Sequence, residues 1–353
     1  MSRLGGRHRT SHRARRTGKR GGGVSPGVGS GQKGTTTLFT QLAAQVRGSV
    51  KLDEPLARYT TYRIGGPAAA LVVPRDCDDV VRLVHFCLET GTPWLPLGLG
   101  SNVLISDRGF PGLVIRLGKG MDRMQVDAGG DGLWWVGAGV PTPRLARRTA
   151  AAGLAGVQRL IGVPGTVGGG VAMNAGAHGQ EFGQVVQRVE VVNSAGELHT
   201  LTGSDVPWRY RGSGLEDVVI TAATLQLSPG DPVALRRDVQ RHLRWRREGT
   251  PFDEPCCGSV FRNPGAIDGR KGPQHGEQRS AGQLIDAAGL KGFRIGGAVV
   301  SPKHANYVVN AGGATAADVL GVIDAIQGKV LQDFGVELEL ELKIIGQGAG
   351  SRE

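Results

Sequence analysis

A glycine-rich stretch at residues 160–179 is the first candidate for chemistry in this sequence. Its glycines are interleaved with small apolar residues and with Pro164, whereas a flexible linker would be polar and rich in serine. Glycine lets other groups approach the backbone closely and leaves its N–H groups bare, so the stretch suits a flat, phosphorylated cofactor. Close packing of glycine turns against a sheet is the alternative that the residues leave open.

A second candidate for a phosphate cradle is Gly-Leu-Gly-Ser-Asn at residues 98–102, where a strand is expected to run into a tight turn. The turn lacks the Gly-x-Gly-x-x-Gly fingerprint, and the pattern after it predicts a strand rather than a helix. A dinucleotide site of the Rossmann kind is therefore excluded. Many turns between strands contain such residues, so this turn alone identifies nothing.

Length and charge bound the class of protein. The chain has 353 residues, enough for two or three domains, and no run of about 18 apolar residues that predicts a membrane span. Nine of its basic residues fall within residues 1–34, which contain no acid, so the net charge of +11 shrinks to +2 for the remainder. We expect residues 1–36 to be a disordered basic tail. Weak attraction to nucleic acid is one interpretation of it, and a dispensable extension or a misplaced start codon is the favoured one.

The four cysteines, Cys77, Cys87, Cys256 and Cys257, do not have the spacing of metal ligands. They suit free thiols in a reducing cytoplasm, and we expect no metal site.

Hydrophobic periodicity places the elements that must position these segments. Helices are expected at residues 38–46, 76–90, 141–152, 233–247, 280–289 and 315–334, the last with a buried stripe of Val319, Val322, Ile323, Ile326, Val330 and Leu331. Strands are expected at 68–73, 93–97, 103–105, 113–117, 134–139, 185–192, 197–201, 218–227, 299–301, 307–310 and 336–345. A loop is expected at 264–278, and the composition shift at 228–232 predicts a domain boundary.

The order of the motifs carries a resemblance that none of them carries alone. After the two glycine segments come Tyr-Arg-Gly-Ser at 210–213, Gly-Ser-Val-Phe-Arg-Asn-Pro at 258–264 and Glu-Leu-Lys-Ile-Ile-Gly at 341–346. Together they resemble the UDP-N-acetylenolpyruvoylglucosamine reductase family, flavin enzymes of peptidoglycan precursor synthesis. The resemblance covers residues 40–346 and is to the shorter type, which lacks a substrate-covering loop.

The resemblance implies an α+β fold. It consists of an FAD-binding module of the vanillyl-alcohol-oxidase (PCMH) type at residues 37–228 and a C-terminal α+β substrate domain at 229–346. The module has two subdomains, at about 37–117 and 118–228, and residues 347–353 are a short tail. No His or Cys is placed for a covalent flavin link, so we expect noncovalent FAD. We also expect a cytoplasmic monomer whose partners are small molecules, not membranes or nucleic acid.

The implied reaction is that of a UDP-N-acetylmuramate dehydrogenase. NADPH reduces FAD, which gives hydride to carbon 3 of the enolpyruvyl ether of UDP-N-acetylglucosamine, and a proton goes to carbon 2. The carbanion left by hydride addition is a strong base, so a positioned hydroxyl such as that of Ser259 suffices as the acid. Arg211 can fork onto the substrate carboxylate, and a protonated Glu341 can donate to the same oxygens. From the residues alone, a turn cap is the favoured interpretation of Ser259, and the resemblance reverses it. The alternative for Glu341 is a solvated strand face, which we expect for Glu337.

The resemblance also implies binding residues. The substrate positions are Tyr210, Arg247, Asn263, Lys291 and His304, with Lys291 suited to the diphosphate. The FAD positions are Arg63, Ile64, Gly65, Gly66, Gly98, Gly100, Ser101, Asn102, Gly162, Val163, Pro164, Gly165, Gly168 and Gly169.

The chain departs from the family pattern at four places. Arg262 stands where Lys is frequent, Leu99 replaces a usual glycine of the phosphate turn, and Leu340 replaces a usual proline before Glu341. Cys256 and Cys257 replace small residues before Gly258, which predicts sensitivity to oxidation near the site.

Two other functions compete with this interpretation. Another flavin oxidase of the same fold would react with oxygen and an alcohol and would not need Ser259. A nucleic-acid-binding protein acting through the tail would bind with a steep salt dependence. The nearly neutral charge of residues 35–353 argues against the second.

Overall fold

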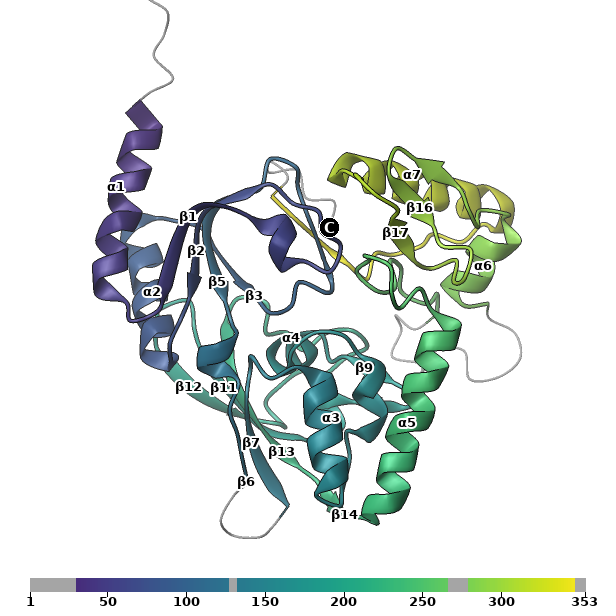
Figure 1. The fold of residues 1–353 in the computed structure, drawn as a ribbon, viewed down its shortest axis with the longest axis horizontal. Helices are drawn as coiled ribbons and strands as arrows, with labels where there is room; N and C mark the ends of the chain where they lie inside the picture. The colour runs from purple at the N-terminus through teal and green to yellow at the C-terminus, as the bar shows by residue number, and fades with distance from the viewer. Residues whose placement is uncertain (1–29, 127–131, 266–278, 347–353) are drawn as a thin grey trace, which may run out of the picture.

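The computed structural model describes residues 30–126, 132–265 and 279–346. The chain forms two α+β subdomains followed by a C-terminal α+β domain (Figure 1). The expected basic tail, up to residue 29, the C-terminal tail at 347–353 and most of the expected loop at 264–278 lie outside the described residues. None of the helices in the described ranges is both long and apolar enough to cross a bilayer.

The first subdomain is a four-stranded sheet with the strand order β1-β2-β5-β3. β1 runs antiparallel to β2, whereas β2, β5 and β3 are parallel. Helix α2 begins and ends as predicted, because Asp76 accepts a hydrogen bond from the Asp79 N–H and Gly91 adopts the left-handed conformation. The bounds are β1 (Ser49–Pro55), β2 (Pro67–Val73), α2 (Cys77–Thr90), β3 (Trp94–Leu97), β4 (Val103–Ile105) and β5 (Phe110–Arg116).

The first helix, α1 (Ser30–Gln45), begins before the predicted start at residue 38 and reaches into the segment predicted to be disordered. Phe39 and Leu42 are buried, and the Phe39 ring centroid lies 5.9 Å from that of Phe86 on α2. Docking of these apolar residues supplies the helix nucleus, after which the helix extends over polar residues that carry no apolar pattern of their own.

The second subdomain is a five-stranded antiparallel sheet with the order β12-β11-β13-β7-β6. Strands β7, β11, β12 and β13 agree with the predicted ones, but β6 was not predicted. The glycine-rich stretch also contains a short helix, α4, that was not predicted. Glycine has a low helix propensity, so packing rather than sequence decides this helix. The bounds are β6 (Met124–Val126), β7 (Leu133–Gly137), α3 (Thr142–Ala151), η3 (Gln158–Gly162), α4 (Val167–Ala172), β11 (Val186–Val192), β12 (Leu198–Thr202) and β13 (Val219–Gln226).

Short elements connect these. They are η1 (Leu56–Tyr59), η2 (Lys119–Met121), β8 (Leu154–Ala155), β9 (Gly176–Ala177), β10 (Gln180–Glu181), η4 (Phe182–Gln184) and β14 (Ser228–Pro229).

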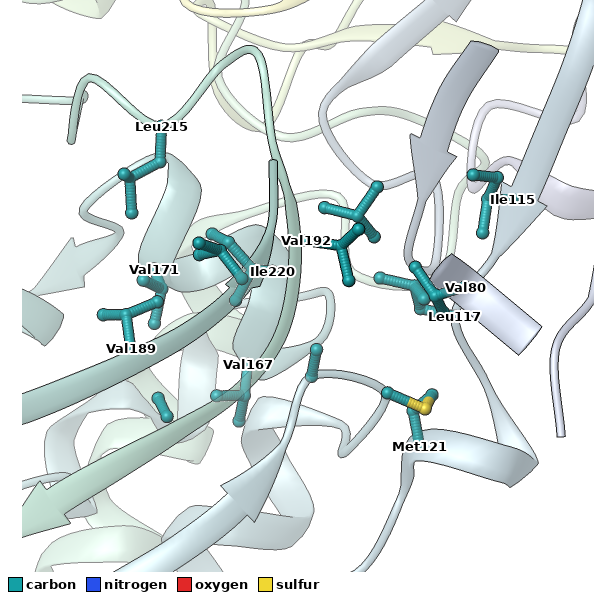
Figure 2. Packing of buried hydrophobic residues seen from close by; sticks show 14 of the residues in the cluster. Val80, Ile115, Leu117, Met121, Val167, Val171, Val189, Val192, Leu215 and Ile220 are labelled. Atoms are coloured by element: carbon teal, nitrogen blue, oxygen red, sulfur yellow. The ribbon is translucent and has the colours of Figure 1, made fainter. Parts of the chain in front are cut away.

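The two subdomains share one apolar core. Figure 2 shows Val80 of α2 and Leu117 near Val192 of β11, with Val167 of α4 and Ile220 of β13 in the same cluster. Each such side chain contributes about 1.5–3 kcal/mol by leaving water. The shared core therefore fixes the two subdomains against each other.

Helix α5 (Pro232–Gly249) links the second subdomain to the C-terminal domain (Figure 1). Leu235 and Val239 pack with Ala146 and Ala150 of α3, so α5 lies on the second subdomain although its residues were assigned to the substrate domain. The C-terminal domain has the sheet order β15-β16-β17. Its bounds are α6 (Ala281–Ala287), β15 (Arg294–Ile295), β16 (Ala298–Val300), β17 (Val308–Asn310) and α7 (Ala316–Phe334).

Two predictions in this domain are wrong in part. Only β18 (Lys343–Ile345) of the predicted strand at 336–345 forms, and it pairs in parallel with β4 of the first subdomain. The alternation survives without the strand, since Leu338 and Leu342 are buried while Glu337 and Glu339 are exposed.

The other error concerns α7. Leu331 is 52% exposed, because it lies one residue, and so about 100° around the helix, from the buried Val330.

Candidate active site

A cavity of about 310 Å³ lies where the two subdomains and the C-terminal domain meet. Its walls come from segments far apart in the sequence. They are the turn at 98–102, the glycine-rich stretch from Gly162 to Ala177, Arg211, the segment 257–259 and Glu341.

The structure brings the two predicted glycine segments together. A Cβ atom at Gly98 would lie 2.5 Å from Thr166 Oγ1, and one at Gly165 would lie 2.8 Å from Ser101 Oγ. Both distances are too short for real contacts, so a side chain at either position would displace a hydroxyl group of the other segment.

The glycines of α4 do different work. A Cβ at Gly168 would meet Ala138 Cβ at 2.8 Å, and one at Gly170 would meet the Phe182 ring at 2.3 Å. These two glycines therefore serve close packing, the alternative to a cofactor surface that the sequence left open. At Gly169 the nearest atom is Thr166 Oγ1 at 3.9 Å, so this glycine leaves an open surface on the cavity side. The N–H groups of Gly168 and Gly170 already donate to backbone carbonyls.

Arg211 and Glu341 form an ion pair in the cavity wall, with Arg211 Nε donating to Glu341 Oε1 over 2.6 Å. Their side chains are only 21% and 15% exposed. Burial raises the pKa of Glu341, although the positive charges of Arg211, Arg262 and Arg246 oppose this. Burial also disfavours the Arg211 charge, but Glu341 and Tyr210 outweigh it and raise the pKa of Arg211.

A strained turn presents Arg211. The backbones of Arg209 and Gly212 hydrogen-bond to each other on both sides of the turn, and Arg211 has a φ of +56°. A non-glycine residue in this region is uncommon and persists only where the surroundings fix it. The turn therefore directs the guanidinium toward Glu341.

Backbone pairing brings Ser259 beside Glu341. The Glu341 N–H donates to the Val260 carbonyl over 2.8 Å and the Arg262 N–H to the Glu339 carbonyl over 2.9 Å. Asn102 Nδ2 donates to the Glu341 carbonyl over 3.0 Å, so the amide of the 98–102 turn holds the backbone of Glu341. The three predicted catalytic residues thus line one cavity.

Several lining residues were not predicted as site residues from the sequence, among them Thr166, Arg246 and Tyr307. Thr166 lies between the glycines of its motif and could have been included on that ground. Arg246 is one of several arginines on α5, and Tyr307 is part of a short apolar strand pattern. No sequence feature separates either from its neighbours.

Several predicted binding residues are not part of the cavity lining. Gly66 packs against the 107–109 turn, where a Cβ would lie 2.2 Å from the Asp107 carbonyl oxygen, and Arg63, Ile64 and Gly65 also lie away from the lining. Asn263 Oδ1 accepts from the Ala281 N–H, and Lys291 Nζ pairs with an Asp286 carboxylate oxygen at 2.7 Å.

Three other predicted substrate positions, Tyr210, His304 and Arg247, are not part of the cavity lining. Tyr210 and His304 each contact a residue that is. The Tyr210 ring centroid is 4.8 Å from Arg211 Cζ, and the His304 ring centroid is 4.8 Å from that of Tyr307. Arg247 Cζ lies 5.5 Å from the Phe252 ring centroid.

The departures from the family pattern are accommodated locally. Arg262 pairs with Glu339 at 3.5 Å, Leu340 forms an isolated bridge with Phe261, and Leu99 joins the cavity lining. Burial raises the pKa values of the Cys256 and Cys257 thiols, which disfavours the reactive thiolate.

The residues of the cavity fit a flavin dinucleotide. In the glycine surface, which we define as residues 162–169, Gly162, Gly165, Gly168 and Gly169 present bare backbone to the cavity, and Val163, Pro164 and Thr166 also line it. Thr166 Oγ1 is buried with no hydrogen-bond partner in the described part of the chain. A buried polar atom of this kind is costly unless a ligand or water satisfies it. Thr166 and the glycine surface would hold the cofactor in the cavity that Ser259, Arg211 and Glu341 also line.

Comparisons with known proteins agree with this geometry. Residues 68–202 match the model of an FAD binding domain, and residues 250–345 match the model of the UDP-N-acetylenolpyruvoylglucosamine reductase C-terminal domain. A UDP-N-acetylenolpyruvoylglucosamine reductase of Heliobacterium modesticaldum is 41% identical over 315 residues, covering 88% of this chain and 96% of the relative. One of Halalkalibacterium halodurans is 40% identical over 312 residues, covering 88% and 99%.

A crystal structure of UDP-N-acetylenolpyruvylglucosamine reductase from Thermus caldophilus is also similar. It superposes with a TM-score of 0.69 at 34% identity, covering 85% of this chain and 99% of that one.

Fold and site together define an oxidoreductase built on an FAD-binding module with a separate C-terminal domain. The chain belongs to the UDP-N-acetylenolpyruvoylglucosamine reductase family.

Proposed function

We propose that the protein uses NADPH to reduce the enolpyruvyl ether of UDP-N-acetylglucosamine to UDP-N-acetylmuramate. The observation that carries this proposal is that Arg211, Ser259 and Glu341 line one cavity together with the glycine surface. An anion binder, a proton donor and a buried carboxyl group are the set that reduction of a double bond beside a carboxylate requires.

When bound, FAD supplies hydride transfer, from NADPH in the first half-reaction and to carbon 3 of the enolpyruvyl group in the second. Arg211 binds the substrate carboxylate, where negative charge grows as carbon 3 takes the hydride. Ser259 donates its hydroxyl proton to carbon 2, so that one hydride and one proton complete the reduced ether. NADP⁺ and UDP-N-acetylmuramate are the products.

Glu341 donates a hydrogen bond to the same carboxylate in its protonated form. Its raised pKa favours that form, and the entry of an anionic substrate beside it strengthens this effect. Arg211 then exchanges its contact with Glu341 for one with the substrate.

Lys291, His304, Asn263, Tyr210 and Arg247 are proposed to contact the UDP-sugar. Because Lys291 and Asp286 are an exposed pair, the lysine is free to change partner at little cost when a diphosphate binds.

The experiment that tests this function is an absorbance spectrum of the purified protein. The protein should carry or take up flavin, lose its flavin absorbance when NADPH is added without oxygen, and regain it when the enolpyruvyl substrate follows. Recovery with oxygen but not with that substrate would identify a flavin oxidase of another specificity instead.

A further inference from the structure

Tyr307 lines the same cavity as Ser259, and the proposed mechanism does not use it. The residue is 3% exposed and directly precedes β17. Its neighbour Asn306 ties the two segments together: the Val260 N–H donates to the Asn306 carbonyl over 2.9 Å, and the Phe261 N–H donates to Asn306 Oδ1 over 3.0 Å. Ser259 and Tyr307 are therefore held at a fixed separation by a rigid backbone connection.

The phenol of Tyr307 has two polar neighbours. The Arg246 guanidinium lies over its ring, with Cζ 5.5 Å from the ring centroid, and Ser259 and Arg246 line the same cavity as Tyr307 and influence the phenol electrostatically. The His304 ring contacts Tyr307 edge-on, and Cys256 lies nearby. Burial raises the pKa of Tyr307, while Arg246 and Ser259 oppose the rise, so the phenol is protonated at neutral pH.

Ser259 needs such a neighbour. If Ser259 gave its proton to carbon 2 without regaining one in the same step, its oxygen would become an alkoxide, a species far too basic to persist in a buried site. A phenol has an ordinary pKa of about 10, well below that of an alcohol, so it can protonate the alkoxide readily. The guanidinium of Arg246 is placed to stabilise the phenolate that results.

We propose that Tyr307 is a positioning residue that directs the Ser259 hydroxyl into the cavity and returns a proton to it. In one concerted step, the Ser259 O–H bond breaks as the carbon 2–hydrogen bond forms, while the Tyr307 O–H bond breaks and its proton restores the Ser259 O–H bond. The Tyr307 phenolate then takes a proton from water. This inference rests on the proposed function, because it concerns the proton-transfer step of that reaction.

The test compares Tyr307→Phe with wild type in the full-length, FAD-loaded protein. Each protein is first reduced by NADPH and then mixed with the enolpyruvyl substrate. Tyr307→Phe should be reduced at the wild-type rate and reoxidised at least about tenfold more slowly. When the reoxidation rate is plotted against the fraction of D₂O in the solvent, the wild-type plot should be curved, because two protons move in the same step. The plot for Tyr307→Phe should be a straight line, because only one proton moves in that variant.

Tyr62→Phe is the matched control. Tyr62 is fully buried, its hydroxyl has no hydrogen-bond partner in the described ranges, and it interacts with Cys257 beside the same segment. This variant should keep both rates and the curved dependence.

The proposal is overturned if Tyr307→Phe is reoxidised within about twofold of wild type, if both half-reactions slow equally, or if the wild-type dependence is straight. Should wild type itself fail to be reoxidised by this substrate, the proposed function fails and the proton relay with it. The first set of results would overturn the relay alone.

Discussion

Arg211 Nε and Glu341 Oε1 lie 2.6 Å apart, although 130 residues separate them in the sequence. One comes from the FAD-binding module and the other from the segment that returns from the C-terminal domain to β4. The site therefore exists only when all three parts of the chain are folded together, and the protonation state of Glu341 depends on how deeply that assembly buries it.

Glu341→Gln should remove a pH dependence. Since the protonated carboxyl group is the proposed donor, wild-type reoxidation should slow as the pH rises through the raised pKa of Glu341. The amide of glutamine donates at every pH, so the variant should show a flat profile over that range. Stopped-flow reoxidation from acidic to alkaline pH measures this. An unchanged profile in Glu341→Gln would assign the titration to another group.

Ser259→Ala should separate the two half-reactions. Reduction by NADPH needs no proton from Ser259 and should keep its rate, whereas reoxidation by the enolpyruvyl substrate should fall about 10²–10⁴-fold. The exposed serine variant Ser204→Ala is the control and should behave as wild type in both. Normal reoxidation of Ser259→Ala would exclude this hydroxyl as the acid.

Gly169→Ala and Gly170→Ala should act on different properties of the same helix. The Gly169 Cβ would project into open space on the cavity side, so the variant should fold normally, with up to about 1 kcal/mol of added helix propensity, but bind FAD more weakly. The Gly170 Cβ would collide with the Phe182 ring, so that variant should lose about 1–3 kcal/mol of stability. Thermal unfolding and flavin titration measure the two effects. Equal flavin affinity in Gly169→Ala and wild type would show that α4 is not the cofactor wall.

The sequence could predict those elements whose pattern is local. Asp76 and Gly91 bound α2 as expected, because a cap acts within its own helix turn. Strands β7, β11, β12 and β13 were predicted because their apolar pattern is also local, whereas the three-residue β6 was not predicted. The predicted strand at 336–345 was wrong over most of its length, since alternation reports which side chains are buried but not whether a partner strand exists.

The site residues also divide into those with a local sequence pattern, which could be predicted, and those that depend on long-range contacts, which could not. The motifs identified Arg211, Ser259 and Glu341, and the structure places all three in the cavity wall. Tyr307 was missed because its importance comes from Asn306 pairing with the 260–261 backbone, a contact between segments 45 residues apart. Spacing along the chain contains no record of such a contact.

Asp107→Ala should loosen the C-terminal domain. Asp107 follows β4 in the first subdomain, and its carboxylate accepts from the N–H groups of Ala316 at 2.8 Å and Ala317 at 3.2 Å, the first residues of α7. A side-chain cap of this kind contributes about 0.5–2 kcal/mol, and a carboxylate also complements the positive end of the helix. Because β4 pairs with β18, just after Glu341, this cap joins the catalytic segment and α7 to the same strand.

The variant should lower the melting temperature by about 2–4 °C for each kcal/mol lost. It should also slow substrate-dependent reoxidation while leaving flavin reduction less affected. Asp107→Asn retains one acceptor oxygen without the charge, so its melting temperature and reoxidation rate should lie between those of Asp107→Ala and wild type. Glu337→Gln changes an exposed acid and should alter neither quantity. Melting of Asp107→Ala at the wild-type temperature would mean that β18 pairing alone holds the C-terminal domain in place.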